Sequence, residues 1–150
     1  MTDGPVPAAP TSPPTAEEQA VIDALTPLGP GSLAATMGIE LLELRADRVV
    51  ARMPVEGNTQ PLGLLHGGAS AVLAETVGSL ASALYAGPGR VALGIELSCS
   101  HHRAMREGDV RATATPLARS RSVATYAIAI TDDAGRPVCT ARLTCLLRPA

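Results

Sequence analysis

Apolar and polar residues alternate along most of the chain, but one segment breaks this pattern. Residues 67–85 are mostly Ala, Leu, Val and Gly with a single charged residue, which predicts a long helix that is apolar nearly all round. Shorter alternating runs predict strands with one buried face. These strands are expected at residues 39–44, 48–53, 90–98, 109–115, 123–131 and 138–147. Turn residues at 132–135 predict a hairpin between the last two.

A helix without a polar face has to be buried, and a single antiparallel sheet curled around it would bury it. Strands and helices do not alternate along the chain, so the sequence predicts an α+β fold rather than a doubly wound one. Thr15 and Glu18 form a capping-box pattern that opens a short helix through about Leu25. We therefore expect one domain over residues 16–150, preceded by a disordered tail at 1–15 that is rich in Pro, Ala, Thr and Ser.

Composition excludes several classes of protein. The net charge is −2, and the chain has no Phe or Trp and only two Tyr, which argues against a nucleic-acid partner. Three cysteines without CxxC spacing indicate neither a disulfide framework nor a metal site. The N-terminus has no basic start followed by an apolar run, and no segment is expected to cross a membrane. We expect a cytoplasmic protein.

Candidate chemistry gathers where the long helix begins. Two glycines, Gly67 and Gly68, leave backbone N–H groups of the first turn uncovered, and these groups can hold an oxyanion beside His66. Glu75 and Ser79 are four residues apart, so they share one helix face. A carboxylate in an apolar helix is costly without a partner or a task, and this helix contains no Lys or Arg. The alternative is a solvent-facing Glu75 and a loop histidine without a role in chemistry.

The spacing Gln60-x-x-Gly63-x-x-His66-Gly67-Gly68, followed by Glu75 and Ser79, resembles the hotdog acyl-CoA thioesterases. The resemblance covers about residues 39–147 and is nearest to the branch that carries its carboxylate on the central helix and acts on hydroxybenzoyl-, dihydroxynaphthoyl- and phenylacetyl-type thioesters. It implies that Glu75 is catalytic and that the Gly67 N–H polarises the thioester carbonyl. It also implies that Gln60 and His66 lie near the same oxygen and that Ser79 orients water or Glu75.

Two later segments extend the resemblance. The run from His101 to Arg103 is similar to the family's His-x-Arg element, and residues 116–125 resemble its CoA-contacting hairpin. The resemblance implies that His101 lines the acyl pocket, that Gly68 belongs to the substrate-binding set, and that CoA phosphates are bound by further residues. These are Arg103, Ser120, Arg121 and Ser122. For the arginines, an ordinary solvated surface is the alternative. No cofactor or metal is implied.

Helix geometry places a constraint on how Gly67 and Glu75 can act together. They are separated by about 12 Å of rise and about 80° around the axis, at 1.5 Å and 100° per residue. A Glu side chain cannot close that gap to reach a carbonyl held at Gly67. If both groups act on one thioester, they come from different chains of an isologous dimer with antiparallel helices. The resemblance implies the same dimer, and its pairing into a homotetramer.

The sequence therefore predicts an acyl-CoA thioesterase that releases free acid and CoA. Glu75 would serve as general base or as nucleophile, and the acyl group would be aryl, short-chain or medium-chain. Two alternatives remain at this point. One is a hotdog hydratase or dehydratase acting on acyl thioesters, and the other is a non-catalytic protein that binds acyl-CoA.

Overall fold

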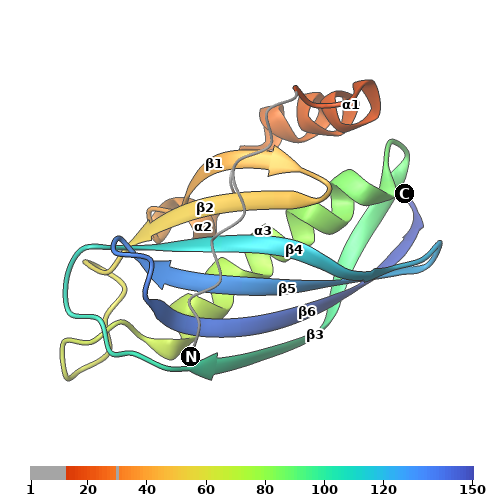
Figure 1. The fold of residues 1–150 in the computed structure, drawn as a ribbon. Helices are drawn as coiled ribbons and strands as arrows, with labels where there is room; N and C mark the ends of the chain where they lie inside the picture. The colour runs from red at the N-terminus through yellow and green to blue at the C-terminus, as the bar shows by residue number, and fades with distance from the viewer. Residues whose placement is uncertain (1–12, 30) are drawn as a thin grey trace.

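The protein is described by a computed structural model that covers residues 13–29 and 31–150 (Figure 1). Three short helical segments come first: α1 (Ala16–Leu25), the 3-10 turn η1 (Thr26–Leu28) and α2 (Ser32–Thr36). Two strands, β1 (Glu40–Arg45) and β2 (Arg48–Pro54), precede the long helix α3 (Gly67–Ala86). Four strands follow: β3 (Arg90–His101), β4 (Asp109–Arg119), β5 (Val123–Asp132) and β6 (Pro137–Pro149).

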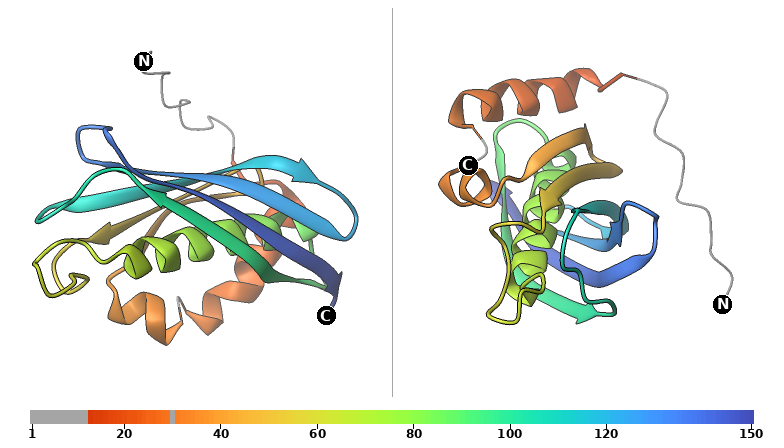
Figure 2. Two further views of the ribbon diagram at one scale, coloured as in Figure 1. Left: turned by 90° about the horizontal axis from the view of Figure 1, so that it is seen from below. Right: turned by 90° about the vertical axis from the view of Figure 1, so that its left-hand side faces the viewer.

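The six strands form one antiparallel sheet in the order β1-β2-β4-β5-β6-β3. The sheet curls around α3, which lies along its concave face, while α1 and α2 lie beside β1 (Figure 2). The expected α+β arrangement of one sheet around one long helix is confirmed. Each predicted strand is present, and most extend by one to four residues beyond the predicted ends because the β pairing continues past the apolar run.

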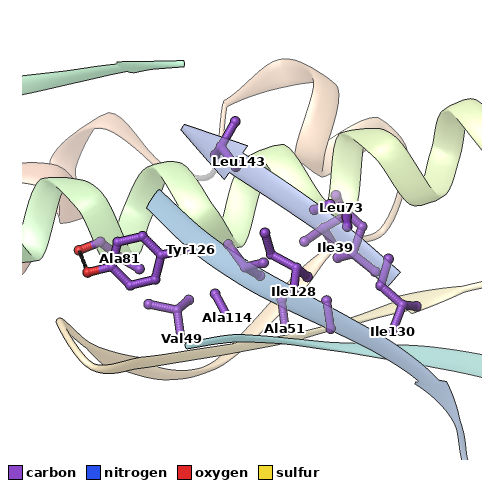
Figure 3. Packing of buried hydrophobic residues seen from close by; sticks show 14 of the residues in the cluster. Ile39, Val49, Ala51, Leu73, Ala81, Ala114, Tyr126, Ile128, Ile130 and Leu143 are labelled. Carbon is purple, nitrogen blue, oxygen red and sulfur yellow. Dashed lines mark hydrogen bonds between the residues drawn. The ribbon is translucent and has the colours of Figure 1, made fainter. Parts of the chain in front are cut away.

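The core fills the space between α3 and the sheet, and its residues follow the alternation of the strands (Figure 3). Tyr126 is fully buried among aliphatic side chains, and its hydroxyl lies 2.6 Å from the Ala46 carbonyl oxygen and 3.1 Å from that of Ala81. Gly78 lets α3 approach β6, since a Cβ there would lie 2.6 Å from Leu143. The polar contacts of Tyr126 and the small residue at 78 fix the position of α3 against the sheet.

Helix α1 is fixed to the body of the protein by one buried carboxylate. Glu18 completes the expected capping box with Thr15. Its oxygens also accept hydrogen bonds from the Arg45 Nε at 3.1 Å and from the Ala46 N–H at 2.7 Å. Burial alone would raise the pKa of Glu18, but the N–H groups of Ala46 and Thr15 and the Arg45 guanidinium together lower that pKa from its ordinary value. The N-terminal end of α1 is thereby held at the β1–β2 turn.

The structure contradicts one expectation, and it describes only part of the segment to which another applies. Contrary to expectation, α3 has the length and mean hydropathy of a membrane span; half of its most apolar window is buried, as in the core helix of a folded domain. Of the predicted disordered tail, residues 1–12 lie outside the described residues. Within the described remainder, the Pro13 carbonyl oxygen accepts a hydrogen bond from Arg45 and Thr15 caps α1.

Candidate active site

The start of α3 presents one backbone donor without a partner. His66 is the N-cap, and its Nδ1 accepts the Gly68 N–H at 2.8 Å, so this nitrogen carries no proton. The His66 carbonyl oxygen accepts hydrogen bonds from the N–H groups of Ala69 and Ser70. The Gly67 N–H, in contrast, donates to no atom in the described part of the chain. It lies at the positive end of a 20-residue helix, where an oxyanion is stabilised.

A cavity of about 360 Å³ opens beside this N–H group. Gln60, Gly67, His101 and Arg103 are among its lining residues. The imidazole of His101 lies against Gly67, because a Cβ placed there would be 2.9 Å from its Nε2. Gln60 has its amide oxygen engaged by the Leu62 N–H at 2.6 Å, which leaves its amide N–H groups as the available donors. The structure thus brings four of the predicted residues to one cavity.

Glu75 lies elsewhere, near the middle of α3. Its Oε1 accepts a hydrogen bond from the Ser79 hydroxyl at 2.9 Å, and among the described residues no basic side chain forms an ion pair with it. The carboxylate points at β3, where a Cβ on Gly94 would overlap Oε1. A β-bulge interrupts the pairing of β3 with β6 at this point. Bulges are frequent next to active sites, where they re-aim the local chain.

A second and larger cavity, of about 540 Å³, opens beside Ser79. Residues of α1, η1, α2, β1 and α3 line it, and eight of the twelve are aliphatic. The lining residues are Ile22, Leu25, Thr26, Gly29, Ala34, Ile39, Leu41, Leu44, Thr76, Ser79, Leu80 and Leu84. Neither Gly67 nor His101 belongs to this set. Within one chain, therefore, the free N–H group opens on one cavity, whereas the carboxylate is bonded to Ser79, which lines the other.

The residues expected to contact CoA also separate into two groups. Arg103 is exposed and lines the cavity at Gly67. Ser120, Arg121 and Ser122 are exposed at the tip of the β4–β5 hairpin. Figure 1 shows this hairpin near the C-terminus, at the end of the sheet opposite the loop that precedes α3. The eleven residues of β4 span about 36 Å at ~3.3 Å per residue, so one chain does not bring the two groups together.

Two features near the site were missed by sequence reasoning. Gly94 provides the space for the Glu75 carboxylate, and a lone glycine inside a strand pattern is the signal that could have indicated such a close approach. No sequence signal indicated that α1 and η1 form a wall of the larger cavity, because this depends on how the N-terminal segment packs against α3. His66, expected near the substrate oxygen, caps α3 through its Nδ1.

Comparison with known proteins agrees with this architecture. The family described as the thioesterase superfamily matches residues 62–139. The chain is 46% identical to a proofreading thioesterase, EntH, of Cronobacter turicensis over 82% of this chain and 90% of that protein. The structure superposes on a thioesterase from Haemophilus influenzae with a TM-score of 0.79 and 36% identity, covering 85% of this chain and 90% of the other.

A thioesterase from Staphylococcus aureus, solved as a Gln-to-Ala variant, is 32% identical with a TM-score of 0.76 and covers 79% of this chain and 100% of the other. The same protein was also solved as a Glu-to-Ala variant.

The chain belongs to the thioesterase superfamily. It is a thioester hydrolase with the hotdog fold, which confirms the thioesterase part of the predicted function.

Proposed function

We propose that the protein hydrolyses acyl-CoA thioesters at sites shared between two subunits, with Glu75 of one chain and the Gly67 N–H of the other acting on the same thioester. The observation that carries this proposal is the separation of the two groups along one rigid helix. The free N–H group opens on one cavity, while the carboxylate lies about 12 Å further along α3 and is bonded to Ser79, which lines another. Among the described residues of one chain, the Gly67 N–H group has no carboxylate near it, and the Glu75 carboxylate has no oxyanion donor near it.

Strand β3 supports the pairing of two chains. It lies at the edge of the sheet, bonded only to β6, and it exposes 43% of Leu93 and 60% of Ile95 beside Gly94. An exposed apolar edge strand is a template for another strand. An isologous pair formed across β3 would run the two α3 helices antiparallel and set each Glu75 toward the partner's helix start. Association of two such dimers into a tetramer remains part of the proposal.

The same pairing accounts for the separated CoA residues. In an antiparallel dimer, the hairpin end of one chain lies next to the α3 start of the other. Ser120, Arg121 and Ser122 of the Glu75-bearing chain would then approach the same ligand as Arg103 of its partner. Arginine binds phosphate groups through paired N–H donors, which suits the nucleotide end of CoA.

The chemistry requires a base or nucleophile and an oxyanion donor. Glu75 either takes a proton from water as the water attacks the thioester carbonyl, or attacks that carbon itself to give a mixed anhydride that water then cleaves. In both routes the negative charge that develops on the carbonyl oxygen is held by the Gly67 N–H, with His101 and Gln60 beside it. Cleavage of the carbon–sulfur bond releases the CoA thiolate. Ser79 keeps the carboxylate in place.

The relatives support the roles of Gln60 and Glu75. In the Staphylococcus aureus thioesterase, the replaced Gln and the replaced Glu stand as far apart along the chain as Gln60 and Glu75 do here. A structure of a hypothetical thioesterase from Streptococcus pneumoniae, which shares 20% identity with this chain, contains coenzyme A. The spacing agrees with the roles of Gln60 and Glu75, and the bound coenzyme A agrees with an acyl-CoA substrate.

The direct test is hydrolysis of a small acyl-CoA panel, with released thiol as the readout. We expect turnover by the wild-type protein and a loss of about 10² or more in kcat for Glu75→Gln, since a required base or nucleophile is removed. Glu17→Gln makes the same chemical change at an exposed position of α1 and should leave kcat unchanged. If Glu75→Gln retains a tenth of wild-type kcat while remaining folded, Glu75 does not have this role.

A further inference from the structure

The larger cavity differs from the smaller one in the origin of its walls. Much of its lining comes from α1, η1, α2 and β1, all of which precede the segment that matches the superfamily. Ile22 and Leu25 of α1 and Thr26 of η1 form the side that faces α3. The opposite side is formed by Leu80 and Leu84 of α3. These elements are thus separate in sequence from Gly67 and Glu75, which lie on α3.

One lining residue of the cavity contacts the Glu75 carboxylate. Ser79 lines it, and the hydroxyl of Ser79 donates to the Glu75 Oε1 at 2.9 Å. A carbonyl carbon attacked at Glu75 carries the acyl group on one side and the thiol on the other. The acyl group needs an enclosed space next to Ser79, and the cavity of about 540 Å³ has the size of a typical small-molecule site, ~300–1,000 Å³.

The lining indicates the chemical class of that acyl group. None of the lining residues is ionisable, and only three carry hydroxyl groups. The Thr26 hydroxyl donates to the Ile22 carbonyl oxygen and the Thr76 hydroxyl to that of Val72, while Ser79 donates to Glu75. Each hydroxyl hydrogen is thus already engaged, and no donor points into the space. A charged or acceptor-bearing acyl group would lose its water without compensation there.

The position of α1 is set at its other end. Glu18 fixes the first turn of the helix to the β1–β2 turn through Arg45 and Ala46. The last turn, with Leu25, is then held at a set distance from α3 and closes the cavity. If that contact loosens, the wall moves and the size of the cavity changes.

We propose that α1 and η1 form the specificity-determining wall of this enzyme: the cavity they close against α3 takes an uncharged hydrocarbon acyl group, and the attachment of α1 through Glu18 limits its length. This inference rests on the proposed thioesterase function. It gives Leu25, Ala34 and Glu18 roles in choosing the substrate, although none of them takes part in bond cleavage.

The test is a chain-length series. For acetyl-, butanoyl-, hexanoyl- and octanoyl-CoA, kcat/KM should rise about fourfold per added methylene until the cavity is full, as expected for burial of one CH2 group. Glutaryl-CoA should be hydrolysed at least about tenfold less efficiently than pentanoyl-CoA, because its carboxylate would be buried without a partner. Equal rates for glutaryl- and pentanoyl-CoA would overturn the assignment of an uncharged acyl group.

Two variants test the wall itself, and a third, at Ala34 of α2, fills the cavity that the wall closes. Ala34→Leu adds side-chain volume to the cavity, so a long acyl chain would be overpacked there. The octanoyl-to-acetyl ratio of kcat/KM should fall by at least about tenfold. Leu25→Ala widens the cavity, and Glu18→Gln loosens the attachment of α1. Both should shift the preferred acyl chain length upward. Leu28→Ala is the matched control, because Leu28 is 74% exposed and does not line the cavity. It should leave the ratio unchanged.

The outcomes separate this inference from the function on which it rests. If acetyl-CoA is hydrolysed but no wall variant changes the length ratio, the wall assignment is wrong and the thioesterase function stands. If the variants change the oligomeric state in size-exclusion chromatography without changing the ratio, a second chain occupies the cavity instead. If no acyl-CoA is hydrolysed, the proposed function fails. In that case, stabilisation by octanoate in a thermal melt, present in wild type and lost in Ala34→Leu, still reports on the cavity, and its absence overturns the inference as well.

Discussion

At the scale of single residues, the backbone N–H of Gly67 can be tested with two variants that disturb its surroundings alike. Gly67 is the first residue of α3, where proline is well tolerated, and His66 before it has the extended backbone (φ −70°, ψ 133°) that precedes proline favourably. Gly67→Pro removes the N–H group and Gly67→Ala keeps it, while both place a Cβ against the exposed His101 ring. We expect kcat of Gly67→Pro to be about 10²–10³ lower than that of Gly67→Ala.

Steady-state thiol release measures this difference, and thermal melts show whether both variants are folded. The comparison between the two variants is the informative one, since the steric effect on His101 is common to them. Equal kcat values for Gly67→Pro and Gly67→Ala would show that the N–H of residue 67 does not stabilise the oxyanion.

Gly94 gives a second prediction at this scale. A Cβ at this position would overlap the Glu75 Oε1, so Gly94→Ala should displace the carboxylate from its bond with Ser79. Displacing a catalytic group by about 1 Å can cost ~10² in rate, and we expect a fall of that order in kcat with little change in melting temperature. Ser100→Ala, on an exposed position of the same strand, is the control. Unchanged kcat in Gly94→Ala would mean that the orientation of Glu75 seen here is not the active one.

These residues show how far sequence reasoning reached. Gly67 and Glu75 could be singled out as candidates because each conflicts with its local environment: one is an uncovered helix start and the other a charge in an apolar helix. The capping role of His66 could not be predicted, because it depends on a side-chain rotamer. The closeness of Gly94 to Glu75 depends on how β3 is placed against α3, a contact between segments far apart in the sequence.

At the scale of elements, the attachment of α1 through Glu18 should depend on pH. The folded state lowers the pKa of this carboxyl, so its contribution to stability is full above the unfolded value of about 4.3 and is lost as the pH falls through the folded value. Glu18→Gln should therefore lower the free energy of unfolding by about 1–3 kcal/mol at neutral pH, typical for hydrogen bonds to a buried charge. The difference from wild type should shrink as the pH falls below about 4.

Urea unfolding at a series of pH values measures this effect. Glu17→Gln is the matched control, since Glu17 is the exposed neighbour of Glu18 on the same helical turn. It should change stability by no more than about 0.5 kcal/mol throughout. A destabilisation of Glu18→Gln that is the same at pH 3 and pH 7 would contradict the role of the ionised carboxylate.

The elements themselves could be predicted closely from the sequence. Strands β4, β5 and β6 alternate buried and exposed residues, and α3 has too few polar residues to face water. The order of the strands in the sheet, with β3 at the edge beyond β6, could not be predicted from periodicity, because it depends on non-local pairing. That order places the apolar edge next to Glu75, and so it bears directly on the proposed dimer.

At the scale of the whole molecule, the shared site makes two inactive variants able to restore each other. Glu75→Gln and Gly67→Pro damage different halves of the proposed site. In a dimer that contains one chain of each kind, one site carries both changes and the other carries neither. Equal amounts refolded together should form heterodimers as half of all dimers, if pairing is random. With one intact site in each, about a quarter of wild-type activity should return.

The complementation measurement needs two controls. Each variant refolded alone has to remain inactive, and the heterodimer has to be demonstrated, for example by a tag on one chain and co-purification of the other. If both groups acted within one chain, every site in the mixture would retain a lesion and activity would stay at the level of the single variants. An absence of recovery in proven heterodimers would therefore refute the shared site. Recovery would require that Glu75 of one subunit reaches a thioester held at Gly67 of another, as the separation of about 12 Å along α3 demands.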